Sequence, residues 1–305
     1  MKDAVDRRWL LGAATALVGS GALTGGRASW ATTPDVDGVV EAEAQFDPFG
    51  RPSIEVYVNG EGPFRFLVDT GATTTAIFRR NAERLGLPET GLTTVFDTTG
   101  AIESAVVHIT ELKAGIVSRR NFTGVVIDDH AGVQADGIIG ADVFDERLVT
   151  FDFGNGVVRI EPTAHRRNVN RINRVSFRDG VLAEVRGMVG RVSARMIIDT
   201  GAARSIANLA LSEALRDKHP NMKRLPKVRV FGISGNAIVG EGLLLPAVRF
   251  GPVTMTRIAV ASAPVAIFDA WELSDEPAML LGADVLRHLE YFSIDYRTGE
   301  FLVQT

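Results

Sequence analysis

The chain of 305 residues contains no cysteine. This absence excludes disulfide bonds, thiolate nucleophiles and every cysteine-ligated zinc or iron–sulfur site. An excess of positive charge is also missing, because the formal net charge is −4, which argues against phosphate-driven nucleic-acid binding. With 46% hydrophobic and 23% charged residues, the chain is too apolar for disorder and too charged for several membrane spans. We therefore expect a folded protein, and its length fits two domains of roughly 150 residues.

Patterns that usually hold metals or cofactors are absent as well. None of the five histidines has another histidine three or four residues away, so there is no zinc-binding His-x-x-x-His helix. Phosphate- and dinucleotide-binding glycine loops are missing from the folded part of the sequence, and so is a Gly-x-Ser-x-Gly nucleophile elbow. Asp128, Asp129 and Asp136 are candidates for a cation site, with solvated loop carboxylates as the simpler interpretation. We expect no metal and no cofactor.

Residues 1–31 have the order of segments found in an export signal. Lys2, Arg7 and Arg8 precede an apolar run of about 14 residues, which is shorter and milder than a membrane span. Ser29-Trp30-Ala31 then supplies a small-x-small cleavage site, and the stretch from Arg7 to Leu11 resembles a twin-arginine signal. We expect residues 1–31 to be a signal peptide and the protein to be exported, to the periplasm. The alternative is an uncleaved N-terminal anchor facing the same compartment.

The remaining sequence contains three landmarks twice, in the same order. They are an apolar run ending in Asp-Thr-Gly-Ala, an apolar segment running into Gly-Ala-Asp-Val, and a hairpin-like segment. The pairs are 64–72 with 194–202, 137–144 with 279–286, and 149–158 with 292–301. Such order implies duplication of one unit of about 130 residues. We expect two lobes, 32–165 and 166–305, joined by a polar, basic linker.

Local patterns in both halves are mostly those of β-strands. Residues 53–58 alternate with period two, which places Ile54, Val56 and Val58 on one face, and residues 227–231 alternate likewise. Hairpin turns are expected at Asn155-Gly156 and Thr298-Gly299. Short helices are expected at 79–85 and 209–218, and Asp142 and Asp284 as N-caps of two more. The fold class is therefore all-β, with a few short helices.

Asp69 and Asp199 are the candidate catalytic pair. Each follows an apolar strand and begins a tight Thr-Gly turn, an arrangement that exposes a carboxyl at the floor of a cleft. Two such groups meeting on a pseudo-twofold axis share one proton, because both cannot be ionised cheaply. The ionised member can then deprotonate a water while the protonated member bonds a carbonyl, which hydrolyses an amide. The alternative is a pair of structural Asp-containing turns, but the joint recurrence of apolar run, Thr and Ala weighs against it.

The repeated motif resembles that of the aspartic proteases, and the retropepsin-like branch more closely than the large pepsins. The matching residues are 67–75, 82–87, Ile138-Ile139-Gly140 and Leu280-Leu281-Gly282, and the resemblance covers about residues 40–305. It implies two pseudo-twofold-related β-barrel lobes in one chain, active as a monomer on extended polypeptide. Asp69 and Asp199 would form the dyad.

The resemblance also implies roles for the residues around the two aspartates. Thr70 and Thr200 would bond across the two loops, while Gly71 and Gly201 would approach the carboxyls closely and donate N–H groups. Ala72 and Ala202 stand where many pepsins have a serine whose hydroxyl bonds the carboxylate. Because fewer donors to the charged form raise a carboxyl pKa, we expect activity at mildly acidic to neutral pH.

Each lobe has a candidate flap, at 95–102 and 230–238, about 30 residues after its aspartate. Such hairpins close over an extended peptide and bond its backbone; ordinary surface hairpins are the alternative. The residues expected to contact substrate are Phe96, Thr98, Thr99, Gly100, Phe231, Ile233, Ser234 and Gly235. For Phe96 and Phe231, core packing remains an equal alternative to lining substrate pockets.

Three functions are compatible with these residues. The first is a general exported aspartic endopeptidase, and the second is a non-catalytic or very selective peptide-binding module with the same fold. The third is a self-processing or regulated protease that acts on one partner protein. Retention of Asp-Thr-Gly in both halves favours an enzyme over the binding module.

We predict that the exported protein begins at Thr32, because cleavage follows the small-x-small site at 29–31. N-terminal sequencing of the protein recovered from the periplasm tests this prediction. An N-terminus at Met1 would contradict it.

Overall fold

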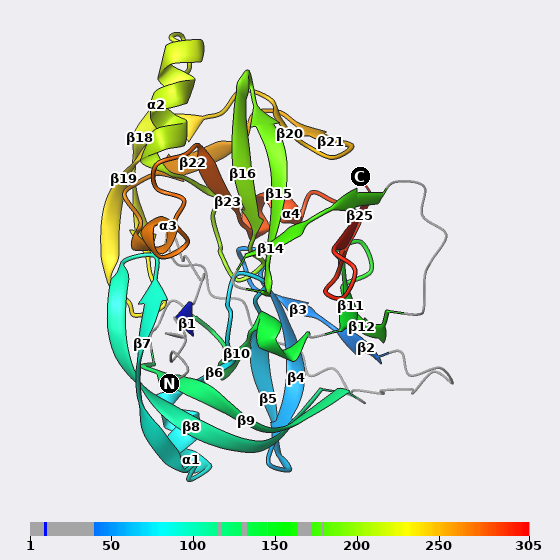
Figure 1. The fold of residues 1–305 in the computed structure, drawn as a ribbon. Helices are drawn as coiled ribbons and strands as arrows, with labels where there is room; N and C mark the ends of the chain where they lie inside the picture. Colours follow the sequence, from blue (N-terminus) through cyan, green and yellow to red (C-terminus); the bar gives the residue numbers. More distant parts are fainter. Residues whose placement is uncertain are drawn as a thin grey trace, which may run out of the picture.

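The structure is a computed structural model. It describes residues 9–10, 40–114, 117–129, 133–144, 146–163, 172–178 and 180–304. Two lobes, each built on one large sheet, flank a third sheet to which both halves of the chain contribute (Figure 1). The expected signal peptide lies outside the described residues except for Trp9–Leu10, and so does the expected lobe boundary at 165/166.

The N-terminal lobe is built on a nine-stranded sheet with the order β1-β7-β8-β9-β6-β10-β5-β4-β3. Its strands are β1 (Trp9–Leu10), β3 (Gln45–Phe46), β4 (Pro52–Val58), β5 (Glu61–Val68), β6 (Ala76–Phe78), β7 (Glu89–Asp97), β8 (Gly100–Ala114), β9 (Val117–Ile127) and β10 (Gly137–Ile139). The alternation predicted for the β4 segment is confirmed, since Ile54, Val56 and Val58 are at most 1% exposed. This face, together with the apolar faces of β5 and β8, forms the lobe's core.

The C-terminal lobe repeats this arrangement. Its sheet has the order β18-β19-β22-β17-β23-β16-β15-β20-β21, and β14 pairs with β15 off this path. Its strands are β14 (Ser176–Arg178), β15 (Leu182–Val189), β16 (Val192–Ile198), β17 (Ile206–Ala207), β18 (Arg224–Phe231), β19 (Ala237–Leu244), β20 (Val248–Phe250), β21 (Val253–Met255), β22 (Ala259–Ser262) and β23 (Ala278–Leu281). The stretch from β18 to β15 matches β7 to β4 strand for strand, so the duplication in sequence is present in the fold.

A six-stranded sheet joins the lobes, with the order β13-β25-β24-β11-β12-β2. Its strands are β2 (Val40–Glu43), β11 (Arg147–Asp152), β12 (Val157–Pro162), β13 (Ile172–Arg174), β24 (Tyr291–Asp295) and β25 (Glu300–Gln304). β11 and β24 pair antiparallel at its centre, where the rings of Phe151 and Phe292 stack at 4.8 Å. Both expected hairpins are present, with Gly156 and Gly299 at a φ of +69°. This sheet fixes the two lobes relative to each other.

The helices are short, as expected. They are α1 (Arg79–Arg84), α2 (Leu209–Lys218), α3 (Ala266–Ala270), α4 (Ala283–Leu286) and the 3₁₀ turn η1 (Ala141–Val143). α2 has the bounds that the sequence predicts, and the side chain of Asn208 caps it by accepting a bond from the Leu211 N–H. Within the described residues, none of these helices has the length and apolar character needed to cross a membrane.

The prediction that Asp142 and Asp284 are N-caps is wrong. The capping positions belong to Gly140 and Gly282, and the two aspartates lie inside the first turn. The reason is steric: a Cβ on Gly140 would lie 2.4 Å from the backbone of Thr74, so only glycine fits the position before the turn. The aspartates are left to bond elsewhere, as described below.

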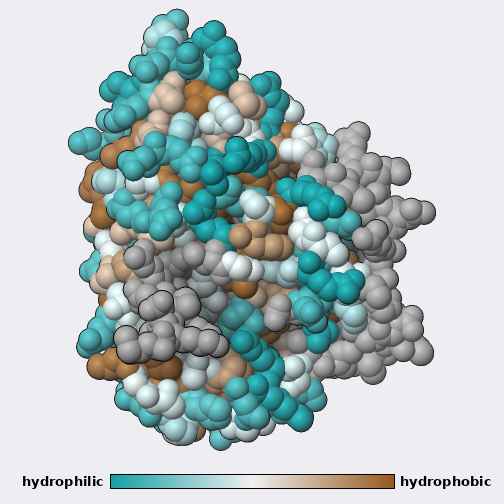
Figure 2. Space-filling model, in the orientation of Figure 1, coloured by the Kyte–Doolittle hydropathy of each residue, from teal (hydrophilic) through white to brown (hydrophobic). Residues whose placement is uncertain are grey.

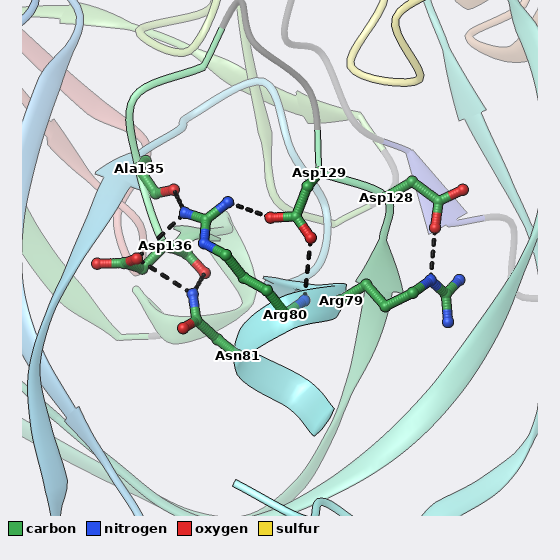
Figure 3. A network of polar contacts seen from close by, with 7 residues as sticks. All are labelled: Arg79, Arg80, Asn81, Asp128, Asp129, Ala135 and Asp136. Atoms are coloured by element: carbon green, nitrogen blue, oxygen red, sulfur yellow. Dashed lines mark hydrogen bonds and ion pairs between the residues drawn. The ribbon is translucent and has the colours of Figure 1, made fainter. Parts of the chain in front are cut away.

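Carboxylates around α1 bind the helix (Figure 3), and within the described parts of the chain no group of three or more acidic or histidine side chains is placed to hold a metal ion. Asp128 accepts from Arg79 at 2.6 Å, and Asp129 accepts from the backbone and the guanidinium of Arg80. Asp136 accepts from the amide of Asn81 at 3.1 Å. The cation interpretation of these acids is therefore replaced by ion pairs that hold α1 against the neighbouring strands.

The surface outside the cores is mixed. On the face drawn in Figure 2, hydrophilic residues cover most of the described surface, including the upper end where α2 lies, and hydrophobic residues appear in separate areas between them. Exposed large apolar side chains occur singly, for example Leu92 on β7 and Val239 on β19. Scattered apolar residues of this kind are normal for a folded protein.

We predict that Gly140→Ala destabilises the protein by about 1–3 kcal/mol, because its Cβ would press on the backbone of Thr74. Gly154→Ala is the matched control, since the nearest atom to its Cβ lies at 3.8 Å. Urea unfolding of both variants measures the difference. Equal stability of the two variants would contradict the steric account of Gly140.

Candidate active site

Asp69 and Asp199 lie at corresponding places in the two lobes. Each directly follows the strand that carries the apolar run, β5 or β16. The backbone N–H of Asp69 donates to the Ile139 carbonyl at 2.9 Å, and that of Asp199 donates to the Leu281 carbonyl at 3.0 Å. The short central strand of each sheet therefore positions the aspartate, and both side chains are fully buried.

The two Asp-Thr-Gly loops are packed so tightly that each glycine faces the other lobe's carboxyl. A Cβ built on Gly71 would lie 2.3 Å from Cγ of Asp199, and one built on Gly201 would lie 2.1 Å from Cγ of Asp69. The N–H of Gly71 donates to Oδ1 of Asp69 at 2.8 Å, while in the second loop the N–H of Ala202 donates to Oδ1 of Asp199. The close approach of backbone to carboxyl that the family resemblance implies is therefore present at both Gly71 and Gly201.

Thr70 and Thr200 form a reciprocal set of hydrogen bonds between the loops. The Thr70 hydroxyl donates to the Ile198 carbonyl at 2.7 Å, and the Thr200 hydroxyl donates to the Val68 carbonyl at 2.6 Å. Each hydroxyl also accepts from the other threonine's backbone N–H at 3.1 Å. All of these groups are buried, so the bonds lock the two aspartates into one rigid unit.

A second repeated contact, which the sequence did not predict, joins the segment after each Asp-Thr-Gly loop to the short helical turn that packs against it. The hydroxyl of Thr75 donates to Oδ1 of Asp142 at 2.9 Å, and the hydroxyl of Ser205 donates to Oδ1 of Asp284 at 2.8 Å. Thr75 and Ser205 both stand six residues after an aspartate of the dyad. That shared spacing was the available signal. Burial raises the pKa of Asp142 and of Asp284, and the hydroxyl bonds oppose this rise.

The dyad is electrostatically asymmetric. Burial raises the pKa of Asp199 well above its ordinary value, and the charge of Asp69 raises it further. Burial also raises the pKa of Asp69, but a hydrogen bond from Asp199 and the N–H of Gly71 oppose the rise. Apart from a proton shared between the two carboxyls, neither Oδ2 atom receives a hydrogen bond from the residues that the structure describes. This arrangement favours a proton on Asp199 and a negative charge on Asp69.

Two further buried groups interact electrostatically with Asp69, and sequence reasoning missed both. Arg51 is 1% exposed and pairs with Asp47 at 2.5 Å, and its charge lowers the pKa of Asp69. Tyr296 is also buried, and this burial, together with the negative charge of Asp69, raises the pKa of its phenol. Arg51 carries no sequence signal, whereas Tyr296 stands in the third repeated landmark.

The two predicted flap segments are hairpins whose tips meet. The first is β7–β8, and the second is β18–β19. Phe96 packs partly against the C-terminal lobe's apolar cluster, and Ile233 is buried in the cluster that contains Ala72. Thr98 is buried, and its hydroxyl donates to the Phe231 carbonyl at 3.3 Å. Thr99, Gly100, Phe231 and Ser234 are half-buried, and Gly235 is exposed. Contact of these residues with substrate stays a prediction.

Comparison with known proteins gives one family. A family model described as an aspartyl protease matches residues 54–143 and 183–285, which together make up more than half of the chain. Each matched region contains one Asp-Thr-Gly loop and the apolar-apolar-Gly segment that supports it. No curated protein matches the chain.

We predict that Asp199→Asn increases the free energy of unfolding at neutral pH. The pKa of Asp199 is higher in the folded state than its ordinary value of 3.8. Such a carboxyl lowers the free energy of unfolding as the pH rises from about 3.8 towards the folded-state pKa, because the unfolded state loses its proton first. Asparagine does not ionise, so each unit of raised pKa is worth about 1.4 kcal/mol. Urea unfolding at neutral pH and near pH 4 measures the difference in the free energy of unfolding between the variant and the wild type. This difference should be smaller near pH 4. A variant less stable than wild type at pH 7 would contradict this account.

Proposed function

Since this chain belongs to the aspartyl protease family, we propose that it is an endopeptidase that hydrolyses peptide bonds with a water activated between Asp69 and Asp199. The observation that carries the proposal is the pairing of two buried carboxyls across facing Asp-Thr-Gly loops. The reciprocal threonine bonds support it, because a proton shared between two acids requires fixed geometry.

The asymmetry of the dyad assigns the starting roles. Asp69, held in the charged form by the Gly71 N–H and the nearby charge of Arg51, accepts a proton from the water. Asp199, whose pKa is raised by burial and by the charge of Asp69, donates a hydrogen bond to the oxygen of the scissile carbonyl. Water and carbonyl are thus polarised together, and neither acid forms a covalent bond to the substrate.

The remaining steps return the dyad to its starting state. The water oxygen bonds to the carbonyl carbon, its proton passes to Asp69, and the proton of Asp199 passes to the carbonyl oxygen, giving a tetrahedral diol. The carbon–nitrogen bond then breaks as Asp69 gives its proton to the leaving amine and Asp199 recovers a proton from a hydroxyl of the diol. The sum is one peptide bond and one water consumed, with one carboxyl and one amine formed.

The hairpins support an extended polypeptide as substrate. The edge of strand β7 can pair with an extended segment, because Trp9–Leu10 of the same chain pairs with it in parallel at Val95 and Phe96. Backbone pairing of this kind is a common way to hold an extended peptide. Because both aspartates are in one chain, a monomer holds a complete site, and the signal-like residues 1–31 support action after export to the periplasm.

We predict that Asp69→Asn and Asp199→Asn each lower hydrolysis of a peptide mixture by at least about 10³-fold, because each removes one member of the acid–base pair. Asp217→Asn, at an exposed carboxylate on α2, is the matched control and should retain activity. A pepstatin-type inhibitor should block the wild type, and the pH–rate profile should peak between mildly acidic and neutral pH.

The same assay separates the enzyme from a peptide-binding module. If the wild type binds peptides but cleaves no faster than the two dyad variants, the endopeptidase proposal fails and the binding module replaces it. Proteomic mapping of cleaved sites distinguishes a general degrader from a protease that acts on a single partner.

A further inference from the structure

The tips of the two hairpins are joined by one carboxylate. Asp97, at the end of β7, is fully buried and accepts from both the backbone N–H and the hydroxyl of Ser234 through Oδ2, at 3.0 and 2.7 Å. Its other oxygen, Oδ1, accepts from its own turn, from the N–H and hydroxyl of Thr99 and the N–H of Gly100. Asp97 forms no ion pair within the part of the chain that the structure describes. Its charge is therefore stabilised by these five donors. We call the contact between Asp97 and Ser234 the clasp.

The clasp depends on a difference between the two repeats. Val95-Phe96 and Val230-Phe231 correspond, but the next residue is Asp97 in the first hairpin and Gly232 in the second. A Cβ on Gly232 would lie 2.1 Å from Oδ2 of Asp97, so the second hairpin has only a backbone where the first has a carboxylate. A symmetric pair of hairpins would place two carboxylates or two glycines here, and neither would make this contact.

Next to the clasp, each hairpin places an apolar side chain in the apolar cluster of the opposite lobe. Ile233, next to Ser234, is buried in the N-terminal lobe's cluster with Leu67, Ala72 and Val95. In the other direction, Phe96 packs against the C-terminal lobe's cluster, and the Thr98 carbonyl accepts from the N–H of Ala266 at the start of α3. Figure 1 shows β7 of the lower lobe reaching α3 of the upper one. Each hairpin is thus anchored in the opposite lobe.

This closed cover lies over the dyad. Ala72 and Ala202, which end the two Asp-Thr-Gly-Ala loops, belong to the same apolar clusters as Ile233 and Val230 of the second hairpin. Asp69 and Asp199 are fully buried beneath these contacts. A polypeptide therefore reaches the carboxyls only after the hairpin tips have separated.

We propose that Asp97 is a positioning residue whose carboxylate clasps Ser234, seats Ile233 in the N-terminal lobe and holds the free protein shut, so that release of this clasp admits the substrate. The inference rests on the proposed peptidase function for its kinetic consequence, but the clasp itself exists in the protein without substrate. Its opening selects for extended or unfolded segments, because a folded surface does not fit between the tips.

Asp97→Asn tests the clasp selectively. The amide oxygen can keep the three donors of its own turn. The amide NH₂ then faces the backbone N–H of Ser234, which can only donate, so this bond of the clasp is lost, while the Ser234 hydroxyl keeps a contact only by turning to accept. Ser234→Ala removes the hydroxyl alone and serves as the milder second variant. Ser118→Ala is the matched control, since Ser118 also donates to a carboxylate, Glu111, but in the exposed β8–β9 hairpin.

Hydrogen exchange of the wild type and variants, without substrate, measures opening directly. Amides at 230–238 should exchange about tenfold faster in Asp97→Asn, because hydrogen bonds to a carboxylate are the stronger class. Amides in β24 and β25 should be unchanged, and Ser118→Ala should behave as wild type throughout. The double variant with Ser234→Ala should add little to Asp97→Asn. Unchanged exchange at 230–238 in Asp97→Asn would overturn the proposal, whether or not the protein is a peptidase.

Kinetics with an unfolded polypeptide provide the second measurement. Asp97→Asn should lower KM severalfold and leave kcat within about twofold, since the closed free state competes with substrate. A rise in KM would overturn the proposal, because it would mean that Asp97 binds substrate. If the wild type shows no hydrolysis, the proposed function fails while the exchange result still decides the clasp.

Discussion

The structure depends on bringing two carboxyls together inside the protein, where both cannot be charged without a large cost. The facing glycines, Gly71 and Gly201, make this possible because they have no side chain. The opposite carboxyl occupies the space that a Cβ at either position would need. The buried threonine bonds then prevent the loops from separating. The parallel pairing of β10 with β5 and of β23 with β16 serves the same end, since it fixes the backbone from which each aspartate emerges.

Duplication supplies two equivalent loops, and divergence gives their aspartates different surroundings. The loops, their supporting strands and the hydroxyl–carboxylate contacts behind them are kept in both halves. The surroundings differ: the charge of Arg51 lowers the pKa of Asp69, and the charge of Asp69 in turn raises the pKa of Tyr296, whereas among the described residues Arg51 and Tyr296 are not causes of the pKa shift of Asp199. The hairpin tips differ as well, with a carboxylate in one and a glycine in the other. A single chain allows such differences, because each half can change independently of the other.

The sequence was most informative where a pattern recurs within a short segment. The strand alternation at 53–58, the helix at 209–218 and both closing hairpins are local patterns, and the structure has all of them. Asp142 and Asp284 were misassigned as caps because an aspartate before a short helical run is a local cap signal. The constraint that overrides this signal is not local. The preceding glycine, Gly140 or Gly282, lies against the backbone of the segment that follows Asp-Thr-Gly, at Thr74 or Arg204, where a Cβ would not fit.

By itself, the sequence determined the duplication, the fold class and the positions of the two Asp-Thr-Gly loops, because each is encoded by repeated residues close together in the chain. Only the tertiary structure decided how Asp69 and Asp199 differ in charge, since that depends on their burial, on their contact with each other across 130 residues of sequence, and on the charge of Arg51. It also decided that the tips of the two hairpins meet and are joined by Asp97. Contacts between residues more than a hundred positions apart carry no local pattern, and their energies depend on which groups are excluded from water together.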